Sequence, residues 1–207
     1  MAIAASTSQH AFDGGMNDPV QDSQMGFRLL IDGMARPGSI QIVEKLASPP
    51  QPMSMATGLV VLTLFDQDTP YWIDETFSKD PEIARWIGFH TGALQAGSKD
   101  EASFALLASP SLIGRIEAFN KGTQEYPDRS ATAIVQVEDF IDQTDWYLSG
   151  PGIKHRTMFR PSGLDAGFIE LADRNRALFP RGVDFIFTSP AALACLPRST
   201  VVTSKGG

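Results

Sequence analysis

An almost unbroken apolar run at residues 56–65, ATGLVVLTLF, determines more of the fold than any other stretch of this chain. A run without polar alternation needs burial on every side, so it belongs at the centre of the fold. Periodicity alone does not separate a buried helix from a buried strand. We favour a helix, because Tyr71-Trp72-Ile73, which follows the polar stretch 66–70, makes the better strand. The polar stretch then surfaces beside a central element, where loops often carry chemistry or recognition.

The length of 207 residues fits one large domain, which we place at residues 18–202. Residues 1–17 are small and polar and are expected to form a loose arm. The C-terminal end, residues 199–207 and above all 203–207, is expected to fray. Hydrophobic residues make up 43% and charged residues 20% of the chain, which is typical of a globular protein and not of a disordered one.

The charge distribution argues against several classes of partner. The formal net charge is -7, from 17 basic and 24 acidic residues, and no basic run is present, so a nucleic-acid partner is not expected. The N-terminus lacks the basic and apolar pattern of a signal peptide. The longest apolar run is about half of a membrane span. We therefore expect a soluble, cytoplasmic protein.

Three segments carry a capping residue followed by proline, which is typical of a helix start. Asp18-Pro19 predicts a helix over residues 19–35, ended by Arg36-Pro37-Gly38. Asp80-Pro81 predicts a second helix, to about Ile87, and Ser109-Pro110 predicts a third over residues 111–119. The residues expected to face inward from the first two helices are Phe27, Leu30, Ile31, Met34, Ile83, Trp86 and Ile87.

Strand-forming segments alternate with these helices. We expect strands at residues 39–44, 71–73, 102–107, 131–137, 145–148, 154–159, 183–187 and 192–196, the last two as a hairpin-like pair, and a further helix at residues 163–177. The alternation of helices and strands predicts a three-layer α/β fold with a mixed sheet.

No familiar catalytic signature is present. The chain lacks GxGxxG, GxxxxGK[ST], HExxH and GxSxG, which disfavours a freestanding NTPase, dehydrogenase, zinc peptidase or serine hydrolase. The one cysteine, Cys195, excludes an internal disulfide framework and a Cys-rich zinc site. Its apolar neighbours predict a buried, unreactive thiol.

His90, Asp66 and Asp68 are the first candidates for a site. His90 ends a predicted helix, where the helix dipole favours the protonated ring, and the three histidines of the chain do not have the spacing of a metal site. His90 is either a structural residue bonded to nearby carbonyls or an anion-binding or acid–base residue. Asp66 and Asp68 either stabilise a turn through their own side chains or hold Mg²⁺.

Several arginines lie beside turns or helix ends and have the bidentate donors that phosphate or phosphonate recognition needs. These are Arg28, Arg36, Arg181 and Arg198. Asp184 lies inside an apolar strand, so its carboxylate requires a partner, for which we expect an arginine. Whether the arginines converge depends on the fold.

A series of short elements runs in a fixed order along residues 18–202. Those of the first half are Pro19-Val20-Gln21-Asp22, Phe27-Arg28, Met34 with Pro37-Gly38, Leu62-Thr63-Leu64, and Asp68-Thr69-Pro70 with Trp72. Those of the second half are Phe89-His90-Thr91, Gly150-Pro151-Gly152-Ile153, Phe179-Pro180 with Gly182 and Asp184, and Pro197-Arg198. In this order they resemble the PhnH family, the H subunit of the bacterial carbon–phosphorus lyase system for phosphonate use.

The resemblance implies a three-layer α/β/α sandwich like that of the pyridoxal-phosphate-dependent transferases, but without the cofactor. It implies a homodimer when the protein is alone and assembly with the G, I and J subunits in a core complex. The associated reaction, run with the G, I and L subunits, displaces adenine from MgATP by a phosphonate and yields a ribose 1-phosphonate 5-triphosphate. MgATP is then expected only as a substrate of the assembled complex.

The lysines agree with the expected absence of pyridoxal phosphate, because Schiff-base chemistry needs a lysine in a dry pocket. Most of the six lie in polar or turn-like surroundings, and Lys154, beside His155 and Arg156, comes nearest to an exception.

Three hypotheses follow. The first is a subunit of the phosphonate transferase complex that is not catalytic alone, with anion positioning by Arg28, His90 or Arg198 near Asp68-Thr69. The second is a structural adaptor without a site. The third is a freestanding small-molecule enzyme that uses His90 with Asp66 or Asp68, which requires these side chains to converge within hydrogen-bond reach or through one bridging water. The candidate ligand-binding set is Arg28, Asp66, Asp68, Thr69, His90 and Arg198, with no metal site expected.

Overall fold

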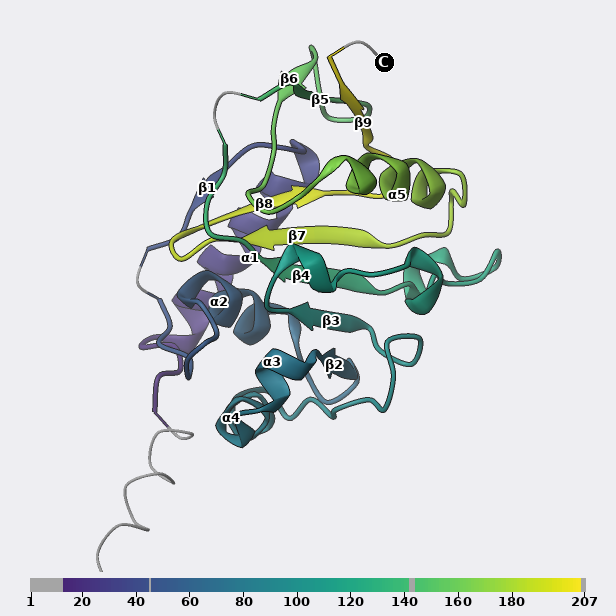
Figure 1. Ribbon diagram of the computed structural model, residues 1–207. Coiled ribbons are helices and arrows are strands. Elements are labelled where there is room, and N and C mark those ends of the chain that lie inside the picture. Colours follow the sequence, from purple (N-terminus) through teal and green to yellow (C-terminus); the bar gives the residue numbers. More distant parts are fainter. Residues whose placement is uncertain (1–12, 45, 142–143, 206–207) are drawn as a thin grey trace, which may run out of the picture.

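The computed structural model describes residues 13–44, 46–141 and 144–205 (Figure 1). The α-helices are α1 (Pro19–Ala35), α2 (Met55–Leu64), α3 (Glu75–Ser78), α4 (Pro81–Thr91) and α5 (Ala166–Arg176). The strands are β1 (Gln41–Ile42), β2 (Tyr71–Ile73), β3 (Phe104–Leu107), β4 (Thr132–Gln136), β5 (Trp146–Ser149), β6 (Thr157–Met158), β7 (Asp184–Thr188), β8 (Ala192–Leu196) and β9 (Val201–Ser204). Three short 3₁₀ turns are η1 (Pro110–Leu112), η2 (Ile116–Ala118) and η3 (Pro127–Arg129).

The main sheet has six strands in the order β1-β8-β7-β4-β3-β2. Strands β2, β3, β4 and β7 are parallel, whereas β8 is antiparallel to β7 and β1 is antiparallel to β8. The expected mixed sheet and the pairing of residues 183–187 with 192–196 are therefore confirmed.

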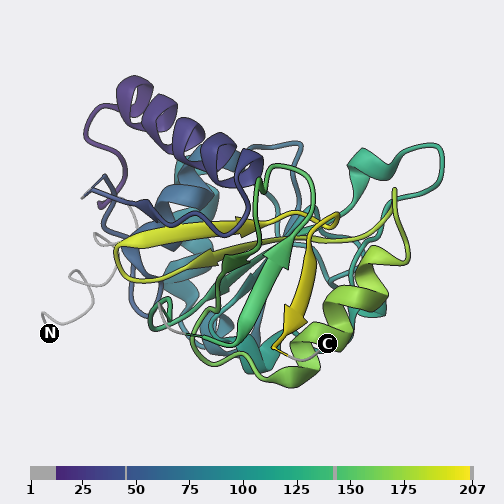
Figure 2. The ribbon, with the colours of Figure 1, turned by 90° about the horizontal axis from the view of Figure 1, so that it is seen from above.

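The sheet separates two hydrophobic cores, because successive side chains of a strand point to opposite faces. On β4, Ala133 and Val135 join one core and Ile134 joins the other. Helices α1, α2, α3 and α4 cover the face of Ile134, and α5 covers the opposite face (Figure 2). The result is a mixed α/β protein with layers on both sides of one sheet.

The layer beside α5 is only partly helical. Strands β6, β5 and β9 form a second, antiparallel sheet that packs on the same core through Trp146, Leu148 and Val202. The strands expected near residues 145–148 and 154–159 exist, but they belong to this small sheet. Local pattern identifies a strand, whereas its partners depend on the whole fold.

The apolar run at the centre of the sequence is the helix α2, as expected. Residues 56–61 are all buried, and Ser54 caps the helix by accepting a hydrogen bond from the backbone N–H of Thr57. The helix packs against α1, α4 and one face of the main sheet (Figure 1). Burial on every side explains why the run shows no polar face.

The helix α1 has the predicted bounds, but one predicted face was wrong. Asp18 caps it, accepting from the N–H groups of Val20 and Gln21. Leu30 is buried, whereas Phe27 and Ile31 are 52% and 51% exposed. Gly26 and Gly33 take the inner positions instead, because the helix approaches its neighbours too closely for a side chain there.

The second capped helix is confirmed and the third is not. In α4, Asp80 caps, and Ile83, Trp86 and Ile87 are buried. The segment 111–119 forms the separate turns η1 and η2, because Ser109 makes no side-chain cap and Gly114 has a φ of +68° between them. Among the described residues, no helix has the length and apolar character needed to cross a membrane.

The C-terminal residues are more ordered than expected. We expected residues 199–207 to fray, but residues 201–204 form β9 and pair with β5. Local composition does not show this, because the strand depends on a partner more than fifty residues away. Of the expected N-terminal arm, residues 1–12 lie outside the described part, and Gly14 accepts a hydrogen bond from the N–H of Ser48.

Candidate functional site

The loop before β2 holds the predicted residues Asp66, Asp68 and Thr69. The Asp66 carboxylate accepts from the N–H of Asp68 at 2.9 Å, and the Thr69 hydroxyl accepts from the N–H of Asp66 at 2.7 Å. Asp66 and Asp68 are exposed, and Thr69 is half-buried. The turn-forming alternative is therefore the one observed for Asp66. No group of three or more metal-binding side chains occurs among the described residues.

His90 lies in the last turn of α4, packed against the rings of Trp86 and Phe89 at 5.0 Å between centroids. Burial lowers the pKa of His90 below 6.5, and a hydrogen bond with the backbone of Asp13 opposes the shift. Desolvation of the ring is thus the larger of the two effects and favours its neutral form. Its Nε2 atom is buried without a hydrogen-bond partner in the described part of the chain.

His90 makes no direct bond to the aspartates in the described structure. No hydrogen bond or ion pair joins its ring to Asp66 or Asp68 among the described residues, and its neighbours are Trp86, Phe89 and the segment 13–15. A direct acid–base pair between His90 and these carboxylates is therefore not formed in the described structure.

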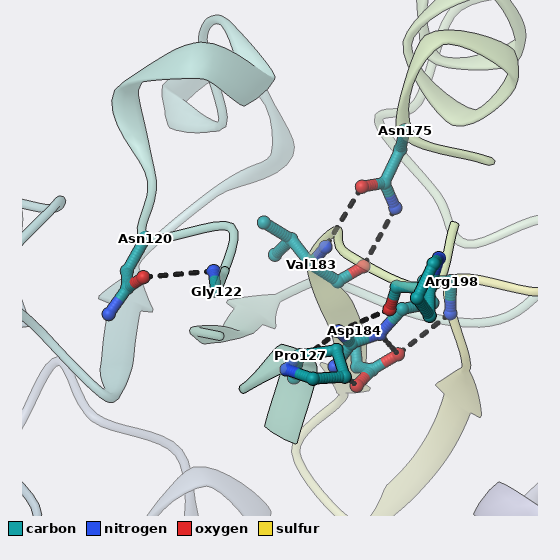
Figure 3. A network of polar contacts seen from close by, with 8 residues as sticks. Asn120, Gly122, Pro127, Asn175, Val183, Asp184 and Arg198 are labelled. Atoms are coloured by element: carbon teal, nitrogen blue, oxygen red, sulfur yellow. Dashed lines mark hydrogen bonds and ion pairs between the residues drawn. The ribbon is translucent and has the colours of Figure 1, made fainter. Parts of the chain in front are cut away.

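Arg198 and Asp184 form the ion pair that the apolar surroundings of Asp184 predicted. The Arg198 guanidinium donates to both carboxylate oxygens, at 3.1 Å from Nε and 2.5 Å from Nη2 (Figure 3). Its Nη1 donates to the carbonyls of Pro127 and Pro180. The two side chains are only 15% and 21% exposed. Arg198 therefore connects β7, η3 and the corner at Pro180, and its donors are largely engaged within the protein.

A second contact holds the same edge of the sheet. Asn175 of α5 exchanges two hydrogen bonds with the backbone of Val183, at 2.7 and 2.8 Å (Figure 3). Val183 directly precedes β7, so this edge is where the parallel strands begin. Nearby in sequence, Arg181 is half-buried, and its Nε has no hydrogen-bond partner in the residues described.

The remaining predicted arginines lie on α1 and at its end. Arg28 is exposed and lines a surface hollow of about 300 Å³ with Gln24, Phe27 and Ile31. Arg36 forms an exposed ion pair with Asp32 at 3.1 Å. The arginines therefore do not converge on one anion site in the described structure.

A cavity of about 790 Å³ opens at the other edge of the sheet, where β3 and β4 end. The carboxyl ends of parallel strands are where open α/β sheets usually bind ligands. The side chains and backbone that line it come from distant segments: Gln51, Pro52, Ser54, Met55, Ala108, Ser109, Pro110, Ser111, Gln136, Val137, Glu138, Ser162, Gly163 and Pro190. None of these residues is basic.

A polar network, partly buried, includes Ser54 and Gln136 from the lining of this cavity. The Gln136 side-chain oxygen accepts from the Ser54 N–H and from the Thr57 hydroxyl, at 2.5 and 2.9 Å. Thr57 and Thr188 share a hydrogen bond of 2.7 Å, and the Gln136 amide donates to the carbonyl of Pro52. Because every member is bonded, the network fixes the start of α2 against the ends of β4 and β7.

Sequence reasoning missed this cavity. A signal existed, since the polar residues Ser109, Gln136 and Thr188 lie at or just after the ends of three predicted strands, and the carboxyl ends of parallel strands share one edge. It went unused because the strand order was unknown. The buried Asp74 was missed too; it caps α3 and accepts from the N–H of Ala108 at 2.5 Å.

Lys99 lies in a turn, as expected for most of the lysines, but it is half-buried. Its ammonium donates to the carbonyls of Leu112 and Ile113 and lies 4.8 Å from the ring centroids of Trp72 and Phe119. Burial lowers its pKa, and Asp74 opposes the shift. The two carbonyl bonds give it a structural role.

The Cys195 thiol is buried and free, as predicted. Burial raises its pKa to about 12, with a smaller contribution from Asp184. A thiol in that state is not a nucleophile at neutral pH.

The described structure thus defines a mixed α/β protein with an open cavity at the carboxyl edge, lined by no basic residue, and no assembled catalytic group among its predicted residues. Comparison with known proteins gives the family. Residues 14–203 match the family of the bacterial phosphonate metabolism protein PhnH, and the chain belongs to this family.

Two curated relatives cover most of the chain. The α-D-ribose 1-methylphosphonate 5-triphosphate synthase subunit PhnH of Rhizobium meliloti (strain 1021) is 43% identical over 189 residues, which is 91% of this chain and 94% of the relative. The putative C-P lyase subunit protein HtxG of Stutzerimonas stutzeri is 29% identical over 183 residues, which is 88% of this chain and 87% of the relative.

Proposed function

We propose that this chain is a subunit of a ribose 1-methylphosphonate 5-triphosphate synthase and acts in phosphonate catabolism. The observation that carries the proposal is the 43% identity to a protein named as that subunit, over 91% of this chain and 94% of the relative. Membership of the phosphonate metabolism family supports the same assignment.

In this proposal the chain works with the G, I and L subunits, which together displace adenine from MgATP by a phosphonate. It assembles with the G, I and J subunits and forms a homodimer when alone, in the cytoplasm. Its fold is related to that of the pyridoxal-phosphate-dependent transferases, but it works without that cofactor. The word subunit in the names of both relatives supports a multi-protein assembly.

The geometry favours a chain that does not catalyse the reaction alone. Asp66 stabilises its own turn, His90 has aromatic neighbours, and Arg198 is bound to Asp184. A cavity without a basic residue is a poor site for a triphosphate or a phosphonate, because these anions need cationic donors. Electrostatic stabilisation of the reaction would then come from another subunit.

The test is an adenine-release assay on the reconstituted complex, with MgATP and methylphosphonate. We expect release with all subunits, none with this chain alone, and a large loss when this chain is left out. Robust turnover by the purified chain would contradict the subunit role. Full activity of a complex without the chain would contradict its participation.

A structural adaptor is the second candidate, favoured by the use of Arg198 inside the fold. Exposed Arg28 separates the two candidates, because it has no ion pair or hydrogen bond in the described structure. Arg28→Gln in the assembled complex leaves turnover unchanged if the chain is an adaptor and lowers it if Arg28 positions an anion. Arg115→Gln, another exposed arginine, is the matched control. Native mass spectrometry verifies assembly of each variant.

A further inference from the structure

The cavity beyond the carboxyl ends of β3 and β4 has the size and the position of a ligand site. Its volume of about 790 Å³ lies within the range that is usual for small-molecule sites. The arrowheads of β3 and β7 point toward this edge of the sheet (Figure 1). Open α/β sheets bind their ligands at this edge, where the loops that follow the strands meet. The lining of the cavity therefore indicates which kind of molecule it binds.

The charge of the lining disfavours anions. Glu138 is the one charged residue among those that line the cavity, and it is exposed. Its carboxylate has no ion pair or hydrogen bond among the described residues. A carboxylate accepts hydrogen bonds and repels a phosphate or a phosphonate, whose binding needs cationic donors. An uncharged ligand that carries a hydrogen-bond donor fits this lining better.

Serine hydroxyls supply hydrogen-bond donors to the cavity. The Ser162 hydroxyl accepts from the N–H of Asp139 at 2.9 Å, and its own hydrogen has no acceptor in the described part of the chain. The hydroxyls of Ser109 and Ser111 share a hydrogen bond of 2.7 Å, which uses one of their two hydrogens. One hydrogen of Ser162 and one of the serine pair therefore remain for a ligand.

The side-chain amide of Gln136 is a further donor, and the polar network holds it in place. One of its N–H groups donates to the Pro52 carbonyl at 3.1 Å, and its oxygen accepts from Ser54 and Thr57. The second N–H has no acceptor among the described residues and is left for a ligand. Because the amide is fixed before binding, a ligand loses less free energy in ordering it.

Apolar surfaces lie between these polar groups. Pro52, Pro110 and Pro190 contribute rings without a backbone donor, and Met55 and Val137 add aliphatic surface. A methionine thioether also makes favourable contacts with aromatic rings. A flat heterocycle can place its faces on such walls and its edge at the few fixed polar groups, which is the usual arrangement of a ligand site.

Adenine is the uncharged molecule of the proposed reaction. MgATP, the phosphonate and the ribose 1-phosphonate 5-triphosphate are anions, whereas the released base is neutral at neutral pH. Its exocyclic amine is a donor for the Glu138 carboxylate, and its ring nitrogens are acceptors for Ser162 and Gln136. The donors and acceptors of the base thus match those of the lining.

We propose that this cavity binds the adenine base that the reaction releases. The identity of the base rests on the proposed function, whereas the preference for an uncharged heterocycle rests on the lining. Before release, the ribose and the triphosphate of ATP extend from the base out of the open side of the cavity, toward cationic groups of another subunit. The chain holds the leaving base, and groups of another subunit act on the bond that breaks.

The first experiment is isothermal titration calorimetry of the full chain with adenine, hypoxanthine and methylphosphonate. We expect saturable binding of adenine, no binding of methylphosphonate, and an affinity for hypoxanthine that is about tenfold lower. Hypoxanthine has an oxygen in place of the exocyclic amine, so it presents an acceptor to Glu138 where adenine presents a donor. Methylphosphonate that binds as tightly as adenine would overturn the exclusion of anions.

The second experiment changes the lining. The amide in Glu138→Gln both donates and accepts, so the preference for adenine over hypoxanthine is expected to fall from about tenfold to about equal affinity. Glu125→Gln, at an exposed carboxylate in the loop before β4, is the matched control and keeps the preference.

Ser162→Phe fills the cavity and is expected to abolish adenine binding. Circular dichroism establishes that each variant is folded. If Ser162→Phe does not fold, Glu138→Gln still tests the site, because Glu138 is exposed and bonded to no described residue.

The results separate the adenine site from the proposed function. A full chain that does not bind adenine, or a Glu138→Gln variant that keeps the full preference, would overturn adenine binding in this cavity. The adenine-release assay of the complex would then still decide the proposed function. If the chain binds adenine with the expected preference but the complex releases none, the site stands and the proposed function is wrong.

Discussion

Asp184 and Arg198 show how a buried charge is stabilised in this chain. The ion pair is less than one-quarter exposed on each side, and the guanidinium also bonds two carbonyls. Removal of one partner leaves the other charge buried without a counter-ion. The resulting loss of folding free energy is larger than the net stability that the intact pair contributes.

Asp184→Asn is therefore expected to lower the free energy of unfolding by about 3 kcal/mol, measured by urea denaturation. Asp173→Asn is the control, because its ion pair with Arg176 is about half exposed, and we expect a change below about 0.5 kcal/mol. Equal effects of the two substitutions would contradict the assigned role of Asp184.

His90 gives a prediction for the dependence of stability on pH. Burial holds its pKa in the folded protein below 6.5, so the unfolded chain binds the proton more tightly. The stability contributed by the neutral ring is present above about pH 6.5 and is lost as the pH falls toward the folded pKa.

The comparison is between His90→Gln and His155→Gln, the latter at an exposed histidine. Urea midpoints measured from pH 7.5 to pH 5 should fall less in His90→Gln than in the wild type, and His155→Gln should follow the wild type. If His90→Gln keeps the full pH dependence, burial of His90 is not its cause.

At the scale of elements, a serine precedes both α2 and η1, but only the serine before α2 caps its helix with a side-chain hydrogen bond. The Ser54 hydroxyl caps α2 and also contacts Thr57, whereas Ser109 precedes η1 without a side-chain cap. Ser54→Ala is expected to lower the free energy of unfolding by about 1 kcal/mol, and Ser109→Ala by much less. Thermal unfolding of both variants measures the difference, and similar losses would mean that the cap of α2 is not important.

Local chemistry predicted most elements correctly, because caps, prolines and apolar runs act within a few residues. The helices after Asp18 and Asp80 have the expected starts, and the run 56–65 is the expected helix. The helix expected at 111–119 failed at Gly114. Periodicity placed Phe27, Leu30 and Ile31 on one inward face of α1. Only Leu30 is buried among these three, because Gly26 and Gly33 are the residues that meet α2 and β8.

At the scale of the molecule, the two cores share one sheet and should unfold together. Trp86 lies in the core of α1 to α4, and Trp146 lies in the core of α5 and the small sheet. In protein labelled with 5-fluorotryptophan, the native ¹⁹F signals of both are expected to disappear at the same urea concentration. Separate midpoints would mean that the two layers fold independently.

The candidate site was predicted less well than the fold, because its residues are distant from one another in the sequence. The cavity at the carboxyl edge is built from segments around Ser54, Ser109, Gln136 and Ser162, which only the tertiary structure brings together. Single-residue reasoning succeeded where a residue's own neighbours decide its state, as for Asp184 and Cys195. It did not reveal the aromatic rings of Trp72 and Phe119 beside Lys99, because both are distant from Lys99 in the sequence.

The two edge strands of the main sheet are short: β1 has two residues and β2 has three. Strands this short present few free backbone groups, so another chain gains little by extending the sheet. Growth into an open-ended filament is thereby disfavoured, and assembly relies on side-chain surfaces that are saturated once a partner is bound. A protein that must join a complex of fixed composition benefits from such a limit.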